Sequence, residues 1–445
     1  MNSIKTASSY AAQFACVGAD CEDTCCAGWT VPVDQAAFER FQQLPSSPLK
    51  VLLEASIELK PMGSPHFAIL RMDAQTGCPI QTPSGLCQLH AQHGEEVLSE
   101  TCRQYPRYKQ SINDQTEVAL ALSCPEAARL VLFHPNLLGI AGNTKPVGAS
   151  EPPNLHAESP LMAWAGQIRA LILWLVASNR QYPLWQRMFL LSIFCHRLDA
   201  LKAGHTEDRI PALLAGFQST VTAGSLRPAF EVLEANGESQ MDVVLQLAGI
   251  LLHQSNVRPR FVECVQAFTA GIGNSPGATL ASLTAGYSTA HEQWFSPFLA
   301  RHPYILENWL VNAILRHRFP FGQQSQAGTD TASAVEQFDG LAANFALMRG
   351  LLTSVAGHYR EQFAASHVVH TVQASSKHFE HHPDFLVKAR ALLQETGLND
   401  ARGTAILLHE ASENKPTATL PLTQDLPLAL GRKPVQSEGT ARNLS

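Results

Sequence analysis

The chain has 445 residues, of which 45% are hydrophobic and 16% are charged, and its formal net charge is −6. This composition excludes wholesale disorder, and a chain of this length can bury a large core without disulfides. Because its net charge is negative, the chain has no overall positive potential of the kind that drives non-specific nucleic-acid binding, so we expect no nucleic-acid partner. The length by itself predicts about two or three domains, or one large domain.

The first part of the chain, residues 1–133, is rich in cysteine and is interrupted by many prolines. Because proline ends or kinks helices, we expect the helices of this region to be short. One helix is predicted directly after Asp34, where hydrophobic residues recur at helical spacing, and another is predicted over residues 49–59. We interpret the whole region as an irregular, Cys-rich, metal-binding domain.

The rest of the chain has a different pattern. Residues 134–155 are rich in Gly, Pro, Asn and Ser and are predicted to be a linker, and residues 156–410 have helical spacing almost throughout. The Pro-rich residues 411–445 are predicted to be a flexible tail. The predicted fold class is therefore mainly α. The strongest predicted helices cover residues 161–175, 241–252, 304–319 and 338–363.

No apolar stretch in the sequence predicts a membrane span. The nearest, residues 161–178, contains Gln167 and Arg169. No secretory signal is predicted either, because Lys5 is the only early basic residue and Gln13 interrupts the short apolar stretch that follows it. We therefore expect a cytoplasmic protein.

Cysteine is the most informative residue type in this sequence. Eight of the ten cysteines lie within the first 124 residues. On a chain without a secretion signal, such a dense set predicts metal binding or catalysis rather than a disulfide framework. The eight candidate metal ligands are Cys16, Cys21, Cys25, Cys26, Cys78, Cys87, Cys102 and Cys124.

Four of these cysteines fall within eleven positions, in residues 16–26. Thiolate is the soft ligand that zinc and iron–sulfur clusters require. The later four are too widely spaced to define a site, so only the tertiary fold can bring them together. The residues alone leave three alternatives open: structural zinc, an iron–sulfur cluster or, least favoured by the expected compartment, disulfides.

The run CVGADCEDTCCAGWTVPVD, residues 16–34, resembles the opening of the flagellin lysine-N-methylase family. The run LCQLHAQHGEEVLSETCRQYPR, residues 86–107, and the segment around residues 119–130 are similar to it as well. This family belongs to a wider group with an iron- or zinc-chelating domain of the CxxCxxCC type. The spacing in this chain, C-x4-C-x3-C-C, has more residues between the cysteines than the CxxCxxCC pattern. It also differs from the C-x3-C-x2-C motif of radical enzymes that use S-adenosylmethionine.

The resemblance implies an S-adenosylmethionine-dependent methyltransferase that acts on the lysine side chains of flagellin. It also implies a cysteine-bound iron–sulfur cluster of the [4Fe–4S] type, with zinc as the alternative metal. A second hypothesis, of another class, is a non-catalytic module in which zinc or a cluster organises a helical interaction surface. The oligomeric state is not predicted.

Methyl transfer to lysine requires a neutral amine, although the free side chain has a pKa near 10.4. Acidic or aromatic residues near the cysteines suit a lysine-bearing substrate, and each has an ordinary alternative as an exposed or capping residue. Arg103 and Arg107 are candidates for binding the carboxylate of the methyl donor, or alternatively for bonding the backbone. The catalytic candidates are Glu22, Asp23 and Tyr105, with Trp29 and Asp34 as further candidates.

Two other motifs are interpreted as structural. The glycine-rich run GIGNSPG, residues 271–277, follows a helical pattern rather than a strand, so we predict a loop and not a nucleotide-binding turn. Five histidines lie within residues 367–382 without cysteines nearby. They are predicted to form a polar, solvated helix end rather than a metal site.

Overall fold

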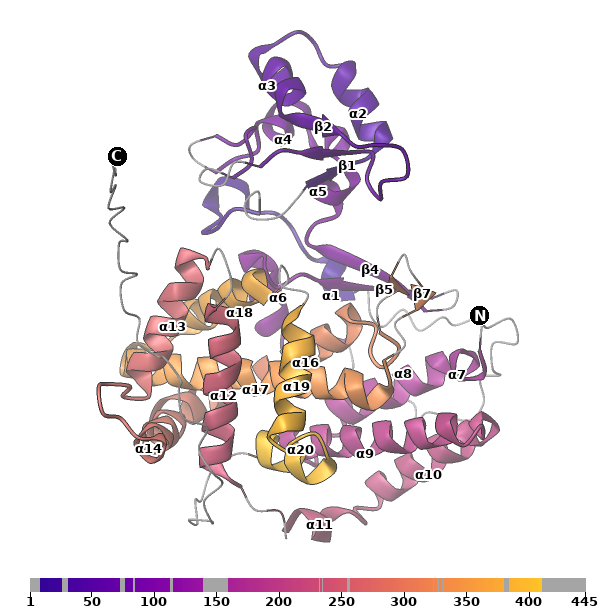
Figure 1. Ribbon diagram of the computed structural model, residues 1–445, viewed down its shortest axis with the longest axis vertical. Coiled ribbons are helices and arrows are strands. Elements are labelled where there is room, and N and C mark those ends of the chain that lie inside the picture. Colours follow the sequence, from indigo (N-terminus) through magenta and orange to yellow (C-terminus); the bar gives the residue numbers. More distant parts are fainter. Residues whose placement is uncertain are drawn as a thin grey trace, which may run out of the picture.

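The computed structural model describes residues 9–25, 31–72, 77–82, 85–112, 115–138, 159–231, 233, 235–253, 257–322, 324–325, 328–329, 332–379 and 384–409. We call the described part of residues 31–104 the small lobe, and the described part of residues 9–14 and 105–409 the helical body. Figure 1 shows the small lobe above the body. Helices make up most of the regular structure and of the core, so the mainly helical fold class is confirmed.

The small lobe combines short helices with a three-stranded antiparallel sheet in the order β1-β3-β2. The sheet aligns Val31 with Leu70 and Ile57 with Leu70 on its two sides. The elements are β1 (Val31–Val33), α2 (Gln35–Gln42), α3 (Pro48–Ser56), β2 (Ile57–Leu59), β3 (Ala68–Leu70), α4 (Gln88–His93), η2 (Glu95–Val97) and α5 (Glu100–Gln104).

Asp34 organises two helices of this lobe. One carboxylate oxygen accepts a hydrogen bond of 2.8 Å from the Ala37 N–H, and the other accepts one of 2.8 Å from the Glu100 N–H. One side chain therefore caps α2 and also holds the start of α5. The helix predicted after Asp34 is confirmed. The helix predicted over residues 49–59 is present as α3, but it ends at Ser56 and the chain continues as β2.

The helical body begins with a short N-terminal helix and a hairpin. These first elements are α1 (Ser9–Ala12), β4 (Arg107–Ile112), β5 (Gln115–Leu120) and α6 (Pro125–Leu132), and η1 (Gly18–Asp20) lies in the segment between α1 and the small lobe. Asn312 fixes them from the far side: its side-chain amide exchanges hydrogen bonds of 2.9 and 3.1 Å with the backbone of Leu120, and its oxygen accepts one of 2.8 Å from Tyr10.

The remaining elements of the body are helical apart from one short strand pair. They are α7 (Pro160–Ala163), α8 (Ala165–Leu173), η3 (Trp174–Ser178), α9 (Leu184–Ala203), η4 (Glu207–Arg209), α10 (Ile210–Thr222), α11 (Arg227–Glu231), α12 (Gly237–Leu252), α13 (Pro259–Gly271), α14 (Leu280–Ala290), η5 (His291–Phe295), α15 (Ser296–Arg301), α16 (Ile305–Arg316), β6 (Gln324–Ser325), β7 (Gly328–Thr329), α17 (Ala334–Tyr359), η6 (Arg360–Gln362), α18 (Ala365–Phe379), α19 (Asp384–Glu395) and α20 (Ala401–Leu408). The long helix α17 crosses the body and packs against α9, α12, α13, α14 and α19 (Figure 1).

Two separate hydrophobic clusters support this arrangement. The smaller one lies in the small lobe and includes Phe41 and Leu53. The larger one fills the body and includes Tyr10 and Phe14 from the N-terminal segment. The described part of the chain therefore begins in the body, leaves it to form the small lobe, and returns. The predicted division into four segments stays a prediction, and its tail of residues 411–445 lies outside the described residues.

The glycine-rich run contributes to helix packing. Gly271 ends α13 where this helix crosses α17, and a Cβ atom at this position would lie 1.7 Å from the carbonyl oxygen of Ser354. Gly357 of α17 faces the same crossing, and its Cβ would lie 2.7 Å from the carbonyl oxygen of Gly271. Only glycine allows the two backbones to approach this closely. This contact sets the position of α13, whose other end faces the small lobe (Figure 1).

Arg169, which argued against a membrane span, is buried in the body. It forms an ion pair with Glu117 of β5, and it donates a hydrogen bond of 3.1 Å to the carbonyl oxygen of Ile314 on α16. Among the described helices, none is both long and apolar enough to cross a membrane.

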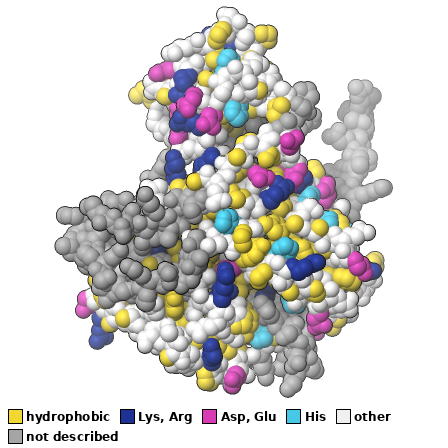
Figure 2. Space-filling model, turned by 180° about the vertical axis from the view of Figure 1, so that it is seen from behind, with side chains coloured by type: hydrophobic (Ala, Val, Ile, Leu, Met, Phe, Trp, Pro, Cys, Tyr) yellow, Lys and Arg dark blue, Asp and Glu magenta, His cyan; other side chains and the backbone are white. Residues whose placement is uncertain are grey.

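The surface carries charges of both signs. Seen from behind, scattered Lys and Arg side chains and scattered Asp and Glu side chains both occur on this face, among hydrophobic and neutral ones (Figure 2). The small lobe also exposes large hydrophobic side chains, among them Val51, Leu59 and Met62.

Candidate functional site

Three cysteines from the later part of the N-terminal set lie at helix starts. Cys87 is the N-cap residue of α4, Cys124 is the N-cap residue of α6, and Cys102 lies in the first turn of α5. The first N–H groups of a helix have no partner within the helix, so they are available to sulfur at such positions. Two of these helices belong to the small lobe and one to the body.

Four thiols interact electrostatically with Cys25: those of Cys21, Cys87, Cys102 and Cys124. Burial is the main reason why the pKa of Cys21 and Cys87 is raised, and why that of Cys102 rises to about 11 and that of Cys124 to about 12. Negative charge on Cys25 raises the pKa of all four further. Because this repulsion requires proximity, the fold brings together cysteines that are up to 103 residues apart in the sequence.

The cysteine thiols have the chemistry that a metal or cluster site requires, but the described residues do not form a complete site. None of the nine described cysteines forms a disulfide with another described cysteine. Among the described residues, no three His, Cys, Asp or Glu side chains are arranged to hold one metal ion, and Cys26 lies outside them. The metal-binding part of the predicted fold class is therefore not confirmed, although the number and softness of the thiols suit an iron–sulfur cluster or zinc.

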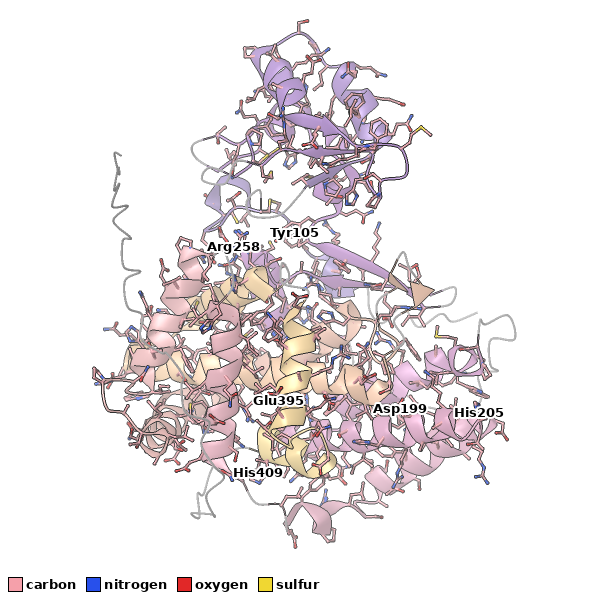
Figure 3. The ribbon with its side chains drawn as sticks, in the orientation of Figure 1. Tyr105, Asp199, His205, Arg258, Glu395 and His409 are labelled. Atoms are coloured by element: carbon pink, nitrogen blue, oxygen red, sulfur yellow. The ribbon has the colours of Figure 1, made fainter. Side chains whose placement is uncertain are left out.

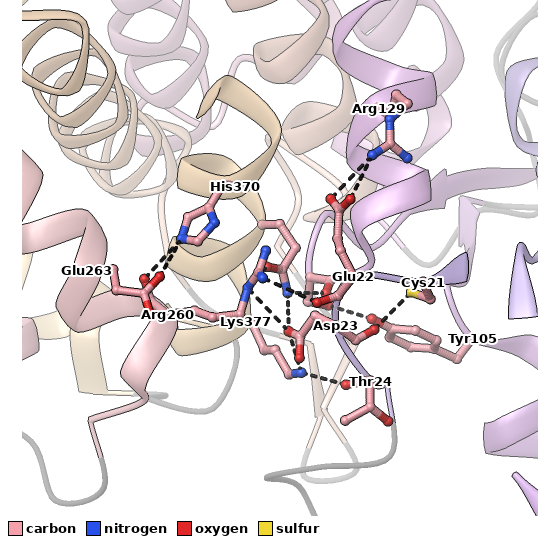
Figure 4. Close-up of polar contacts among 12 residues, drawn as sticks. Cys21, Glu22, Asp23, Thr24, Tyr105, Arg129, Arg260, Glu263, His370 and Lys377 are labelled. Atoms are coloured by element: carbon pink, nitrogen blue, oxygen red, sulfur yellow. Dashed lines mark hydrogen bonds and ion pairs between the residues drawn. The ribbon is translucent and has the colours of Figure 1, made fainter. Parts of the chain in front are cut away.

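Asp23 fastens the cysteine segment, residues 16–25, to the helical body (Figure 4). Its Oδ2 atom lies 2.8 Å from Nζ of Lys377 and accepts a hydrogen bond of 2.7 Å from Nε2 of Gln373. Lys377 also donates to the carbonyl oxygen of Thr24 at 2.5 Å. Lys377 and Gln373 are one turn apart on α18, and both are buried. One face of α18 thus contacts the segment between Cys21 and Cys25 at two adjacent residues.

A second set of contacts surrounds this anchor. Nε of Arg260 on α13 donates to Oε1 of Gln373 at 3.2 Å, and another of its nitrogens donates to the carbonyl oxygen of Glu22 at 3.2 Å. The Glu22 carboxylate faces away and lies 3.1 Å from Arg129 of α6 (Figure 4). Cys21 donates from its sulfur to the carbonyl oxygen of Asp23 at 2.8 Å. Helices α6, α13 and α18 therefore form the floor beneath the cysteine segment.

Comparison with known protein families identifies the part of the chain that forms most of this floor. A model of the FliB lysine N-methylase C-terminal domain matches residues 171–407, which is more than half of the chain. The chain belongs to the FliB lysine N-methylase family. This result confirms the resemblance seen in the sequence. The matched domain supplies Arg260, Gln373 and Lys377, whereas the cysteines of the N-terminal set all precede it.

Curated relatives of the family are similar to this chain over part of its length. Lysine-N-methylases of Salmonella typhimurium and Salmonella choleraesuis are each 24% identical over 140 residues, which is 31% of this chain and 35% of each relative. The flagellar biosynthetic protein FliU of Salmonella muenchen is 24% identical over 136 residues, which is 30% of this chain and 80% of that protein. The similarity thus spans about a third of the two lysine-N-methylases. No solved structure matches.

The catalytic candidates of this family member have different surroundings. Glu22 is exposed and paired with Arg129, whereas Asp23 is engaged by Lys377. The Tyr105 hydroxyl lies 3.2 Å from the hydroxyl of Ser123. Of the two further candidates, Asp34 is the helix cap described above, and Trp29 lies outside the described residues.

The arginines predicted to bind the methyl donor already have acceptors. Arg103 forms ion pairs with Glu96 and Glu100 within the small lobe. Arg107 donates a hydrogen bond of 2.9 Å to the carbonyl oxygen of Phe14 and lies over its ring. These contacts are structural, and the predicted roles of both arginines stay predictions.

Sequence reasoning missed Gln373 and Lys377. Their signal was weak: two long polar residues at i and i+4 in a helix that also carries Val368 and Val369. The same helix departs from the predicted solvated end, because His378 is buried against Phe261. Its Nε2 atom lies 3.0 Å from the carbonyl oxygen of Leu251. His381 and His382 lie outside the described residues.

Proposed function

We propose that this chain is a protein-lysine N-methyltransferase that uses S-adenosylmethionine to methylate flagellin in the cytoplasm. The observation that carries the proposal is the match of residues 171–407 to the lysine N-methylase domain. Two relatives are named lysine-N-methylase, and the name of the flagellar relative supports flagellin as the substrate.

The proposal includes a cysteine-bound [4Fe–4S] cluster, with zinc as the alternative. Its support is the soft donor set around Cys25, which draws thiols from both lobes. When bound, such a cluster supplies iron that acts as a Lewis acid or carries an electron. The thiols that would hold it are those linked to Cys25 (Cys21, Cys25, Cys87, Cys102 and Cys124), and the other predicted ligands are Cys16, Cys26 and Cys78.

The chain's own residues must attract a lysine side chain and remove its proton, because an ammonium group has no electron pair with which to attack a methyl group. The exposed Glu22 carboxylate suits the first task, since it lies beside the cysteine segment and Arg129 engages it only at the surface. Tyr105 is the candidate for orienting the amine, through a hydroxyl that contacts Ser123, and the Glu22 carboxylate is also the candidate for accepting the proton. Asp23 has a positioning role instead, because Lys377 and Gln373 already donate to it.

The test begins with protein purified without oxygen, in which iron and acid-labile sulfide per chain are measured together with the visible spectrum. Purified flagellin is then incubated with this protein and S-adenosylmethionine, and lysine methylation is read by mass spectrometry. We expect a brown protein with about four irons and four sulfides per chain and new methyl groups on flagellin lysines.

Matched alanine variants identify the part played by the thiols. Cys25→Ala should abolish cluster retention and methylation, because Cys25 is the common neighbour of four other cysteines. Cys195→Ala, at a buried cysteine of α9, should keep both. A colourless protein that contains zinc and no sulfide would show that the cysteines bind zinc rather than an iron–sulfur cluster. Absence of methyl transfer from metal-replete protein would refute the enzymatic function and favour a binding module.

A further inference from the structure

Arg258 is a partly buried cation beside the cysteine segment. It is the N-cap residue of α13, at the end of this helix that faces the small lobe, and Tyr105 lies across from it (Figure 3). Within the described residues its guanidinium interacts electrostatically with Asp23 but makes no hydrogen bond. Burial lowers the pKa of Arg258, and the negative charge of Asp23 opposes that shift. The side chain therefore pays for desolvation without a bonded partner.

Asp23 cannot fully compensate this cation, because other donors already occupy it. Lys377 lies 2.8 Å from its Oδ2 atom, Gln373 donates to the same atom at 2.7 Å, and Nε of Arg260 lies 4.0 Å away. Three basic side chains thus share one carboxylate. Arg258 therefore has no hydrogen-bond acceptor of its own among the described residues, and its five N–H donors can bind an incoming acceptor.

The ligand that suits this site is a carboxylate, which matches the planar guanidinium in a two-pronged hydrogen bond. The methyl donor of the proposed reaction carries one carboxylate, on its amino-acid part. Arg103 and Arg107 have acceptors of their own within the chain, as described above. Arg258 has none among the described residues.

We propose that Arg258 binds the carboxylate of the amino-acid part of S-adenosylmethionine and so holds the donor beside the cysteine segment. This inference rests on the proposed methyltransferase function and assigns one contact of its donor site. It requires no covalent step by Arg258, which is a binding residue for the donor.

The test removes the positive charge of Arg258 by substitution and, separately, removes the carboxylate by using a ligand that lacks it. Binding of S-adenosylhomocysteine and of 5′-methylthioadenosine, which lacks the amino-acid part, is measured by calorimetry on the full chain purified without oxygen. Arg258→Met should weaken the binding of S-adenosylhomocysteine roughly 10- to 100-fold. It should leave the affinity for 5′-methylthioadenosine unchanged. The affinity of Arg258→Lys for S-adenosylhomocysteine should lie between those of wild type and Arg258→Met, because lysine keeps the positive charge but cannot form the two-pronged hydrogen bond of the guanidinium.

Arg209→Met is the matched control, since Arg209 is likewise an N-cap residue before a proline-containing first turn, at α10, and it is exposed. It should bind both ligands as wild type does. Unchanged binding of 5′-methylthioadenosine shows that Arg258→Met is folded. Equal losses for both ligands, or no loss for either, would overturn the assignment of Arg258 while leaving methyl transfer by the wild type intact. A wild type that binds no S-adenosylhomocysteine and transfers no methyl group would refute both proposals.

Discussion

At the scale of single residues, burial in the core of the helical body changes the chemistry of an acidic side chain on α17. Asp339 is buried, and desolvation raises the pKa of its carboxyl to about 7, although Arg390 acts in the opposite direction. Its negative charge in turn contributes to the raised pKa of the buried Cys195 thiol, after burial itself and the charge of Asp199. Folding therefore shifts the equilibrium of Asp339 toward its protonated form.

This preference predicts a pH dependence of stability. The pKa is about 3.9 in the unfolded chain and about 7 in the folded one, so the folded state binds the proton more tightly. The contribution to stability is complete below about pH 4 and is lost as the pH rises through 7. Asp339→Asn should flatten this slope in urea titrations between pH 5 and 8. Asp208→Asn, at an exposed position, should keep it; equal slopes for wild type and Asp339→Asn would contradict the assignment.

At the scale of elements, one face of α18 holds the cysteine segment. Lys377 and Gln373 meet Asp23 across 354 and 350 residues of sequence, and α13 adds Arg260. The segment itself contains only the short η1 as regular structure, so these side-chain contacts take the place of a hydrogen-bonded backbone ladder. The position of its thiols therefore depends on a helix at the other end of the chain.

Lys377→Met should release this segment in the metal-free protein. Removing one partner of a largely buried ion pair weakens the compensation of the other charge, and the segment can escape that cost by detaching. We expect backbone hydrogen exchange in residues 18–25 and alkylation of Cys21 to become at least about tenfold faster, which corresponds to 1.4 kcal/mol. Lys388→Met, at an exposed position of α19, is the control. Unchanged exchange in Lys377→Met would show that other contacts hold the segment.

At the scale of the whole molecule, two hydrophobic cores of unequal size meet at the cysteines. The small-lobe cluster has thirteen buried members, whereas the body cluster extends over most of the described helices. A small core has few contacts in reserve, so the loss of one large side chain removes a larger share of its stability. Cys78 belongs to the small core and Cys124 to the large one, so the two cores together place the thiols.

Phe41→Ala should therefore unfold the small lobe at a lower urea concentration than the body. The expected cost is about 3–5 kcal/mol, because Phe41 is buried in α2. Limited proteolysis should then cleave within residues 31–104 while the helical body stays intact. Phe67→Ala, at an exposed phenylalanine of the same lobe, should leave the digestion pattern unchanged. Simultaneous loss of both lobes in Phe41→Ala would show that they fold as one cooperative unit.

The sequence by itself determined the elements whose signals are local. Hydrophobic spacing predicted the helices observed as α12, α16 and α17, and a capping residue correctly marked the start of α2 at Asp34. The short strands β1, β2 and β3 were missed, because three residues are too few to show a period of two. Their pairing comes from the small core rather than from a pattern of their own.

The cysteines show where local information ends. Their crowding and the run of residues 16–34 were sufficient to predict the family and soft-ligand chemistry. The convergence of Cys87, Cys102 and Cys124 on Cys25, the anchoring of Asp23 by Lys377 and the open guanidinium of Arg258 were decided by the tertiary structure alone. The physical reason is that each depends on burial and on charges that are distant in the sequence, and these arise only when the folded chain brings segments of both lobes together.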